Sequence, residues 1–179
     1  RAPTPATRPA PARSSRACCE TPGPTATSTG VTTPIGSDVG APIAGSTVLL
    51  TGASSGIGAA LAPMLAERGA TVAITGRRAD KLAEVLERCQ QHQPACRSYE
   101  IDLADVAATD ALPARVEADL GPVDILVNNA GAPMRRRVQD LTLAEVQSTM
   151  AVNFASPVRL TMALLPGMLE RDRGVVVNV

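Results

Sequence analysis

The sequence predicts an α/β fold in which helices cover both faces of a parallel sheet. Two observations support this class. From residue 46 onward, short apolar runs alternate with stretches of helical periodicity, which is the order expected of repeated βαβ units. The first apolar run is followed directly by a glycine-rich turn and then by a helical stretch, as at the start of a doubly wound sheet.

Four of the five strands are predicted from apolar runs, because strands buried on both faces of a parallel sheet are apolar throughout. The third predicted strand is polar at Arg97, Ser98 and Glu100. The five strands are expected over residues 47–50, 70–74, 97–101, 123–127 and 174–177. The expected strand order of the doubly wound sheet is 3-2-1-4-5.

The helices are expected over residues 56–68, 80–91, 106–120 and 142–168. Gly69 ends the first helix, at a position where helices favour a left-handed residue. The fourth helix opens with a capping box, Thr142-x-x-Glu145. Pro63 lies inside the first helix, where a proline costs about 3 kcal/mol, so we expect a kink there.

Residues 1–45 differ in composition from the rest of the chain. Pro, Thr, Ser, Ala and Gly dominate without apolar periodicity, so this tail is predicted to be disordered, and residues 46–179 form the folded domain. The tail is rich in Arg, Ser and Thr, as transit peptides are, but its prolines disfavour the amphipathic helix of such a peptide. A cytoplasmic location is therefore favoured over organelle targeting.

Composition argues against several classes of protein. The 17 basic and 17 acidic residues balance, which disfavours nucleic-acid binding, and no apolar run approaches the length of about 18 residues that a membrane span needs. The four cysteines form no disulfide framework. Cys89-x2-His92-x3-Cys96 lacks a fourth ligand nearby, so no metal site is expected.

The turn over residues 51–58 reads Thr-Gly-Ala-Ser-Ser-Gly-Ile-Gly and joins the first strand to the first helix. Glycines in such a turn permit a tight bend, close approach of a pyrophosphate to backbone N–H groups, and close helix–strand packing. The helix then directs its positive dipole end at the anion. The residues expected at this cofactor site are Thr51, Gly52, Ser54, Ser55, Gly56, Ile57 and Gly58.

Two further motifs follow in order, Asp102-Leu103 after the third strand and Asn128-Asn129-Ala130-Gly131 after the fourth. With the glycine turn, they resemble the signatures of the classical short-chain dehydrogenase/reductase family over residues 46–179. The resemblance implies a Rossmann-type domain, with Asp102 and Leu103 beside the adenine. It also implies that Asn129, Ala130 and Gly131 line the cofactor site. An extended-branch nucleotide-sugar epimerase is disfavoured, because its glycine spacing usually differs.

The end of the second strand bears on the choice of cofactor. NAD sites place an acid there, about 20 residues beyond the glycines, to bind the ribose hydroxyls. This chain instead has Arg77 and Arg78, whose guanidiniums can pair with a 2′-phosphate. NADP is therefore favoured over NAD, the alternative being a solvated basic turn.

The resemblance implies a catalytic tetrad of Asn, Ser, Tyr and Lys. Asn153 matches the asparagine, which in the family holds a water in a proton relay. Tyr99 is the only tyrosine and Lys81 the only lysine, so no Tyr-x-x-x-Lys is present, and the chain stops at Val179, where the serine is expected to follow. We therefore expect an incomplete domain, truncated after its fifth strand and inactive as given.

The complete protein is expected to be an NADP-dependent oxidoreductase acting between a small-molecule alcohol and a carbonyl, and to form a homo-oligomer. The alternative is a non-catalytic dinucleotide-binding or interaction module. The run of three arginines at 135–137 follows the last motif. A nucleic-acid role for it is disfavoured because aromatic stacking partners are nearly absent. A solvated loop or a partner-facing patch is expected instead.

Overall fold

The computed structural model describes residues 42–179, which lie within one compact unit. The tail predicted to be disordered, including Cys18 and Cys19, falls almost wholly outside the described residues.

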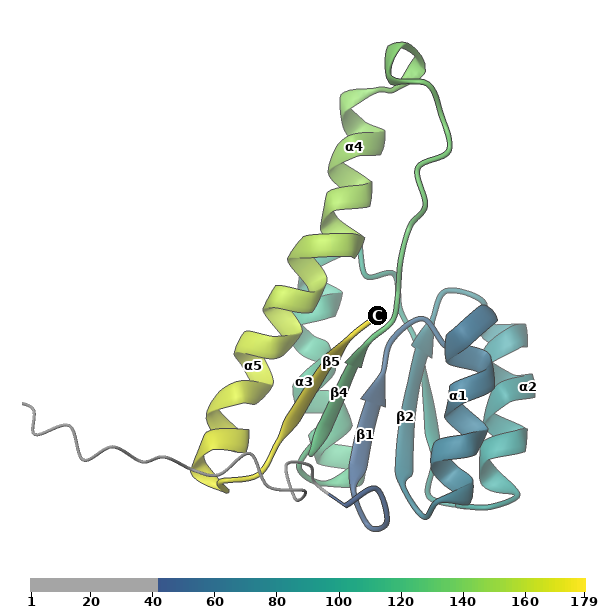
Figure 1. Cartoon of the computed structure of the whole chain (residues 1–179), viewed down its shortest axis with the longest axis vertical. Coiled ribbons are helices and arrows are strands. Elements are labelled where there is room, and N and C mark those ends of the chain that lie inside the picture. Colours follow the sequence, from purple (N-terminus) through teal and green to yellow (C-terminus); the bar gives the residue numbers. More distant parts are fainter. Residues whose placement is uncertain (1–41) are drawn as a thin grey trace, which may run out of the picture. The chain divides into compact units, whose positions relative to one another are not determined.

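Five parallel strands form one sheet in the order β3-β2-β1-β4-β5, which confirms the predicted fold class and order (Figure 1). Their bounds are β1 Thr47–Leu50, β2 Thr71–Gly76, β3 Arg97–Glu100, β4 Ile125–Asn128 and β5 Val175–Asn178. Leu49 of β1 stands in register with Ala73 of β2 and with Leu126 of β4. β1 is buried along its whole length, and β5 lies at one edge of the sheet.

Helices pack on both faces of this sheet, and alternate residues of β1 point to opposite layers. Val48 and Leu50 belong to the core shared with α1 (Gly56–Glu67) and α2 (Ala79–Gln90). Leu49 belongs to the core shared with α3 (Val106–Leu120) and α5 (Ser156–Glu170).

The predicted long helix over residues 142–168 forms as one helical run over residues 143–170, but it is not α-helical throughout. A 3-10 turn, Val138–Asp140, precedes α4 (Leu143–Met150), and a π-helical segment, Ala151–Ala155, joins α4 to α5. α4 projects past the carboxyl ends of the strands (Figure 1). α1 continues through Pro63, which is buried, and Gly69 follows this helix with a φ of +85°.

A network of side chains closes the amino end of the sheet. The backbone N–H of Thr47 donates to Asp124 Oδ2 at 3.1 Å, and Arg173 Nη2 lies 3.4 Å from the same oxygen. Arg173 Nη2 also donates to Ser46 Oγ at 3.0 Å. One carboxylate and one guanidinium therefore hold together the starts of β1, β4 and β5.

Cys89 and Cys96 are free, buried thiols at the end of α2 and the start of β3. Cys96 Sγ accepts the backbone N–H of Val72 at 3.2 Å, and a hydrogen bond to Cys96 together with burial raises the pKa of Cys89. These cysteines pack as core residues. Within residues 42–179, none of the helices combines the length and apolar character needed to cross a membrane.

Candidate functional site

The turn between β1 and α1 is held close to the loop that follows β4. Gly52 has a φ of +71°, and a Cβ atom on it would stand 2.6 Å from Ala130 Cα. A Cβ on Gly58 would stand 2.6 Å from the carbonyl oxygen of Gly52. Side chains at either position would force the two loops apart, so these glycines set the shape of the carboxyl edge of the sheet.

Thr51 joins the two loops from inside. Its buried Oγ1 accepts the backbone N–H groups of Asn129 and Ala130, both at 3.0 Å, and donates to the carbonyl of Val127 at 3.2 Å. The Asn129 side chain adds a second link between the two loops by donating to the carbonyl of Thr51 at 2.9 Å. Thr51 and Asn129 therefore position the candidate site from beneath, and their polar groups are used within the protein.

The amino end of α1 is left without a cap. Ser55 makes no side-chain capping bond, and the first turn of α1 contains no acidic residue. By contrast, Asp105 caps α3 through the N–H of Ala108 at 3.1 Å. Ser55, Gly56 and Ile57 are exposed, and a Cβ on Gly56 would meet nothing within 4 Å. Free N–H groups beside open space fit the pyrophosphate of a dinucleotide.

The arginines after β2 lie next to this turn. Arg78 Nη2 donates to the carbonyl oxygen of Ser54 at 3.0 Å and lies 3.3 Å from Ser54 Oγ. Arg77 is exposed, and its Nη1 lies 3.9 Å from Asp102 Oδ2. Asp102 is itself exposed after β3, whereas Leu103 is buried in the core. The chain thus presents two exposed cationic side chains beside the glycine turn.

Asn153 lies at the centre of the π-helical segment, and its carboxamide pairs with the backbone of one residue. Its Oδ1 accepts the N–H of Ala132 at 2.7 Å, and its Nδ2 donates to the carbonyl of Ala132 at 3.1 Å. A cavity of about 440 Å³ is lined there by Asn129, Ala130, Gly131, Ala132, Pro133, Asn153 and Val179. The structure therefore brings Asn153 together with Ala130 and Gly131. Single π turns inside α-helices are frequent at functional sites.

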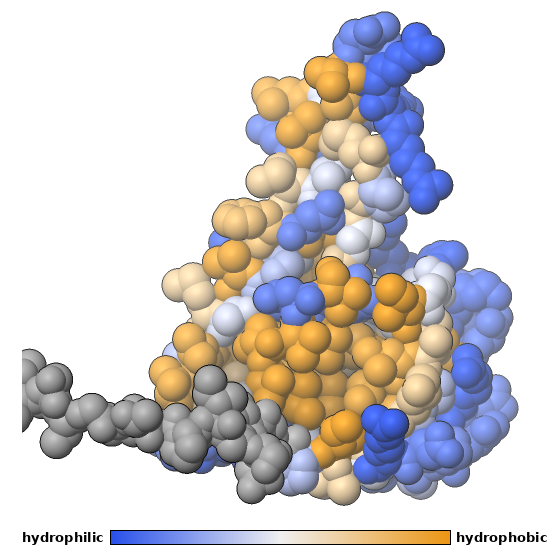
Figure 2. Space-filling model, in the orientation of Figure 1, coloured by the Kyte–Doolittle hydropathy of each residue, from blue (hydrophilic) through white to orange (hydrophobic). Residues whose placement is uncertain are grey.

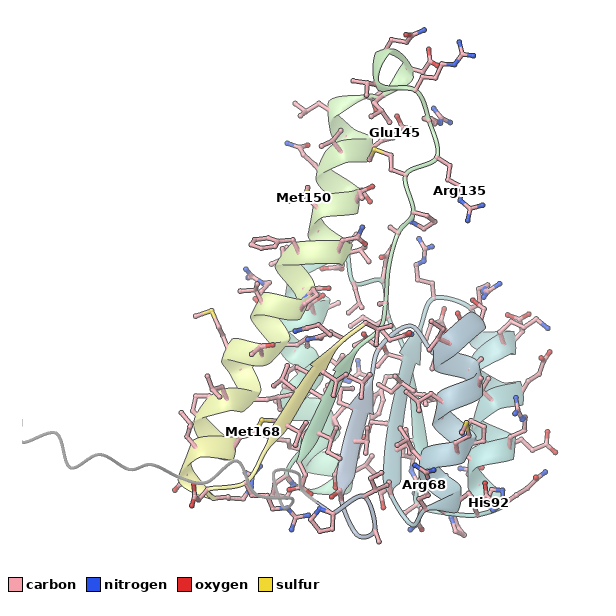
Figure 3. All side chains as sticks on the ribbon, in the orientation of Figure 1. Arg68, His92, Arg135, Glu145, Met150 and Met168 are labelled. Atoms are coloured by element: carbon pink, nitrogen blue, oxygen red, sulfur yellow. The ribbon has the colours of Figure 1, made fainter. Side chains whose placement is uncertain are left out.

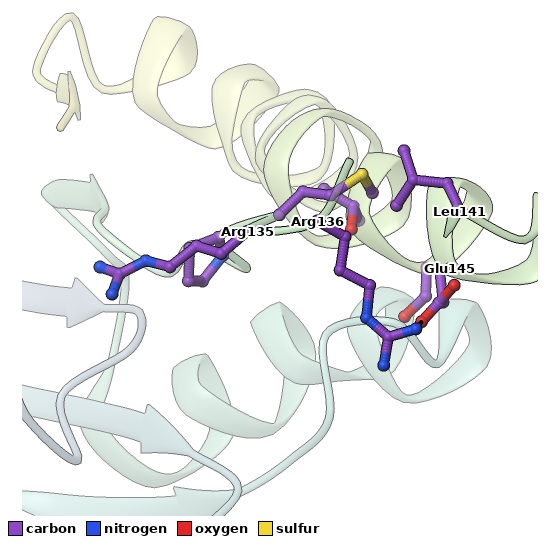
Figure 4. Close-up of a pocket in the computed structure, with 8 residues that line it drawn as sticks. Arg135, Arg136, Leu141 and Glu145 are labelled. Carbon is purple, nitrogen blue, oxygen red and sulfur yellow. Dashed lines mark ion pairs between the residues drawn. The ribbon is translucent and has the colours of Figure 1, made fainter. Parts of the chain in front are cut away.

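A second cavity of about 230 Å³ lies between the loop over residues 131–141 and α4. Arg136 Nη1 pairs with Glu145 Oε1 at 2.9 Å on its wall (Figure 4). The pKa of Glu145 is lowered by the backbone N–H and the hydroxyl of Thr142, and further by Arg136. Sequence reasoning missed this cavity. The sequence features near this cavity are the capping box and the preceding arginines. Neither feature predicts that Arg136 pairs with Glu145.

The chain belongs to the short-chain dehydrogenase family. A profile of that family, described as short chain dehydrogenase, matches residues 46–179. A fatty acyl-CoA reductase of Mycobacterium tuberculosis is 42% identical over 139 residues, which are 76% of this chain and 47% of that protein. The chain thus spans about half the length of this relative.

Solved structures of the family share the fold. A metagenomic short-chain oxidoreductase in complex with NADP superposes with a TM-score of 0.72 at 34% identity, covering 77% of this chain and 62% of the other. A 3-oxoacyl-(acyl-carrier-protein) reductase from Agrobacterium tumefaciens with NADP bound gives 0.70 at 38% identity, covering 76% and 52%. Both of these solved structures contain NADP.

Proposed function

We propose that the complete protein is an NADP(H)-dependent oxidoreductase that interconverts a carbonyl compound and an alcohol. The observation that carries the proposal is the uncapped amino end of α1 beside Arg77 and Arg78, with no acid where NAD would require one. When bound, the nicotinamide would supply or accept the hydride at the carbonyl carbon, and a proton would be exchanged at the oxygen.

The proposal gives each part of the carboxyl edge a role. The N–H groups at the start of α1 hold the pyrophosphate, and Arg77 with Arg78 binds the 2′-phosphate. Asp102 lies on the adenine side. Ala130 and Gly131 line the nicotinamide end, where Asn153 holds the loop through Ala132. Asn153 also holds a relay water, by resemblance to the family.

The chain's only tyrosine and lysine are unsuited to proton transfer at this site. Tyr99 is buried on β3, where its hydroxyl donates to Asp119 at 2.8 Å, and burial raises its pKa. Lys81 pairs with Glu84 at 2.7 Å on the surface of α2. These 179 residues are therefore proposed to bind cofactor without turning substrate over.

The proposed substrate is a ketone within an acyl chain that is carried as a thioester. Support comes from the relatives, since one is a fatty acyl-CoA reductase and another reduces a 3-oxoacyl group on acyl carrier protein, according to their names. Reduction of such a ketone adds one hydride and one proton, and the carrier stays attached.

We also propose that the complete protein is a homo-oligomer. The outer side of α4 and α5 exposes a row of large apolar side chains, and Figure 2 shows apolar surface along these helices. The row comprises Leu143, Val146, Met150, Phe154, Val158, Met162, Leu165 and Leu169. An exposed apolar row of this length is typical of an association surface. Light scattering of the Phe154→Asp variant tests it, since a charge in the row should shift the protein to monomers.

A cytoplasmic location is proposed as well. Its support is that Cys89 and Cys96 are unpaired thiols in the described structure, as is usual in a reducing compartment.

The cofactor proposal is tested by calorimetric titration of the chain with NADPH and NADH. We expect NADPH to bind at least tenfold tighter, and the Arg77→Asp variant to reverse the preference, because it removes a phosphate partner and adds a repelling charge. Arg88→Asp makes the same charge change on the exposed far end of α2 and should leave the preference intact. Equal affinities of the unmodified chain for both cofactors would contradict the proposal.

A further inference from the structure

The loop over residues 131–141 is held by hydrogen bonds at both ends, and its charged residues lie between these two anchors. At its start, Ala132 is held by the Asn153 carboxamide through hydrogen bonds of 2.7 and 3.1 Å. At its end, Thr142 and Glu145 form the capping box of α4. Between these anchors stand three consecutive arginines against one acid, Asp140, which gives the loop a net charge of +2. All three arginines are exposed.

The three arginines differ in their partners. Arg136 is neutralised by Glu145 and lines the cavity beside α4. Arg135 extends in another direction, away from α4 and on the side where α1 begins (Figures 3 and 4). Within the described part of the chain, the side chains of Arg135 and Arg137 make no hydrogen bond or ion pair, so two guanidiniums are unneutralised next to a third.

Adjacent like charges repel, and an arginine without a partner contributes no hydrogen bond to stability. Arg135 and Arg136 line the cavity beside α4, and Arg137 follows them on the same loop. Exposed cations attract anions, and a guanidinium pairs with phosphate through two parallel hydrogen bonds. The free arginines are therefore suited to bind an anionic ligand.

Arg135 also lies close in sequence to the residues that line the cavity at Asn153. Ala132 and Arg135 are three residues apart, a length of chain that spans at most about 10 Å. The cavity at Asn153 and the cavity at Arg136 share Pro133 in their walls. A ligand that reaches from one cavity to the other would have its far end beside Arg135.

We infer that Arg135 and Arg137 bind a phosphate group on the carrier of the substrate. This inference rests on the proposed function, in which the acyl group is carried as a thioester of phosphopantetheine. The phosphates of the cofactor are assigned to the start of α1 and to Arg77 and Arg78, and the arginine loop supplies a second anion site. It would select substrates attached to a phosphorylated carrier over free carbonyl compounds of the same acyl chain.

The test measures binding of three probes to the full chain, by calorimetry in saturating NADPH. Saturation keeps the adenosine part of coenzyme A out of the cofactor site. The probes are coenzyme A, 4′-phosphopantetheine and pantetheine, which share the thiol arm and differ in their phosphates. We expect coenzyme A to bind at least tenfold tighter than pantetheine. 4′-Phosphopantetheine that binds as tightly as coenzyme A assigns the site to the phosphate shared with carrier proteins, and weaker binding assigns it to free coenzyme A.

Variants locate the effect. The double variant Arg135→Gln and Arg137→Gln should lose the preference for coenzyme A over pantetheine while the affinity for NADPH stays within twofold. Arg88→Gln removes one exposed arginine from the far end of α2 and should change neither affinity.

Three outcomes overturn the inference. The first is equal binding of coenzyme A and pantetheine by the unmodified chain. The second is an unchanged preference in the double variant. The third is a loss of NADPH affinity in the double variant, which would place these arginines on the cofactor. Failure of the unmodified chain to bind NADPH at all is a different result, because it contradicts the proposed function itself.

Discussion

The two ends of the sheet differ in whether their polar groups find hydrogen-bond partners within the protein. At the amino end, donors and acceptors satisfy each other, as where Asp124 accepts the N–H of Thr47 and lies near Arg173. At the carboxyl end, Thr51 and Asn129 tie two loops together, and the N–H groups at the start of α1 are left without a side-chain partner. The polar groups are thus paired where the strands begin, whereas backbone donors remain available where the strands end.

The helices repeat this difference. α3 and α4 satisfy their own first turns through Asp105 and Thr142, whereas α1, at the centre of the carboxyl edge, does not. An uncapped helix end costs stability unless water or a ligand supplies the missing acceptors. The capped helices therefore contribute local stability, whereas the uncapped start of α1 leaves donors available to a ligand.

The largest effect is expected from Gly52→Ala at the carboxyl end of the sheet. The added Cβ would overlap Ala130 Cα at a residue whose φ is +71°, so we expect a loss of about 3 kcal/mol in unfolding free energy. NADPH affinity should fall more than tenfold, because the two loops would separate. Gly45→Ala is the matched control, since Gly45 also has a positive φ, +76°, and has open space around it. Chemical denaturation and cofactor titration measure both changes, and equal effects of the two variants would rule out the steric explanation.

A smaller and different effect is expected from Asp124→Ala at the amino end of the sheet. The carboxylate joins Thr47 and Arg173, and its loss leaves the Thr47 N–H without its acceptor. Removing the acceptor of a partly buried donor costs about 2 kcal/mol. The denaturation midpoint should therefore fall while NADPH affinity is unchanged. A parallel loss of cofactor binding would show that the two ends of the sheet are coupled.

Asn153→Ala should act locally on the loop over residues 131–141. It removes both hydrogen bonds to Ala132, which together are expected to contribute about 1 kcal/mol at an exposed position. Amide exchange at Ala132 should accelerate, because its N–H then faces solvent. Gln147→Ala, on the exposed surface of α4, is the control and should leave that exchange rate as it was. An unchanged rate in the Asn153 variant would mean that the backbone alone holds the loop.

The smallest effect concerns Tyr99, which can be followed spectroscopically because it is the chain's only tyrosine. Burial, and then the Asp119 carboxylate, raise its pKa. The neutral form is favoured in the folded state, so stability is fully present below the unfolded pKa of about 10 and falls as pH rises beyond it. The absorbance of tyrosinate should therefore develop at higher pH in the folded chain than in denaturant. Coincident titration curves would show that Tyr99 is accessible to solvent.

Local patterns in the sequence were sufficient for the elements and for the order of the sheet. α3 lies over the residues predicted for it, and the capping box of α4 forms as predicted, because both depend on contacts a few residues apart. The positions of the candidate site residues at the ends of β1, β2, β3 and β4 follow as well, since parallel strands finish at one edge. The π-helical segment at Asn153 has no such local signal and was not predicted.

Only the tertiary structure decided how the site is held. Thr51 meets Asn129 and Ala130 across 78 and 79 residues of sequence, and Gly52 lies against Ala130 because β1 pairs with β4. The pairing of Arg136 with Glu145, which leaves Arg135 and Arg137 free, depends on the path of one loop. The sequence by itself determined which residues stand at the carboxyl edge, because periodicity and turn chemistry act over a few residues. Which of them face a ligand and which support it was decided by contacts between distant segments, and these form only when the sheet assembles.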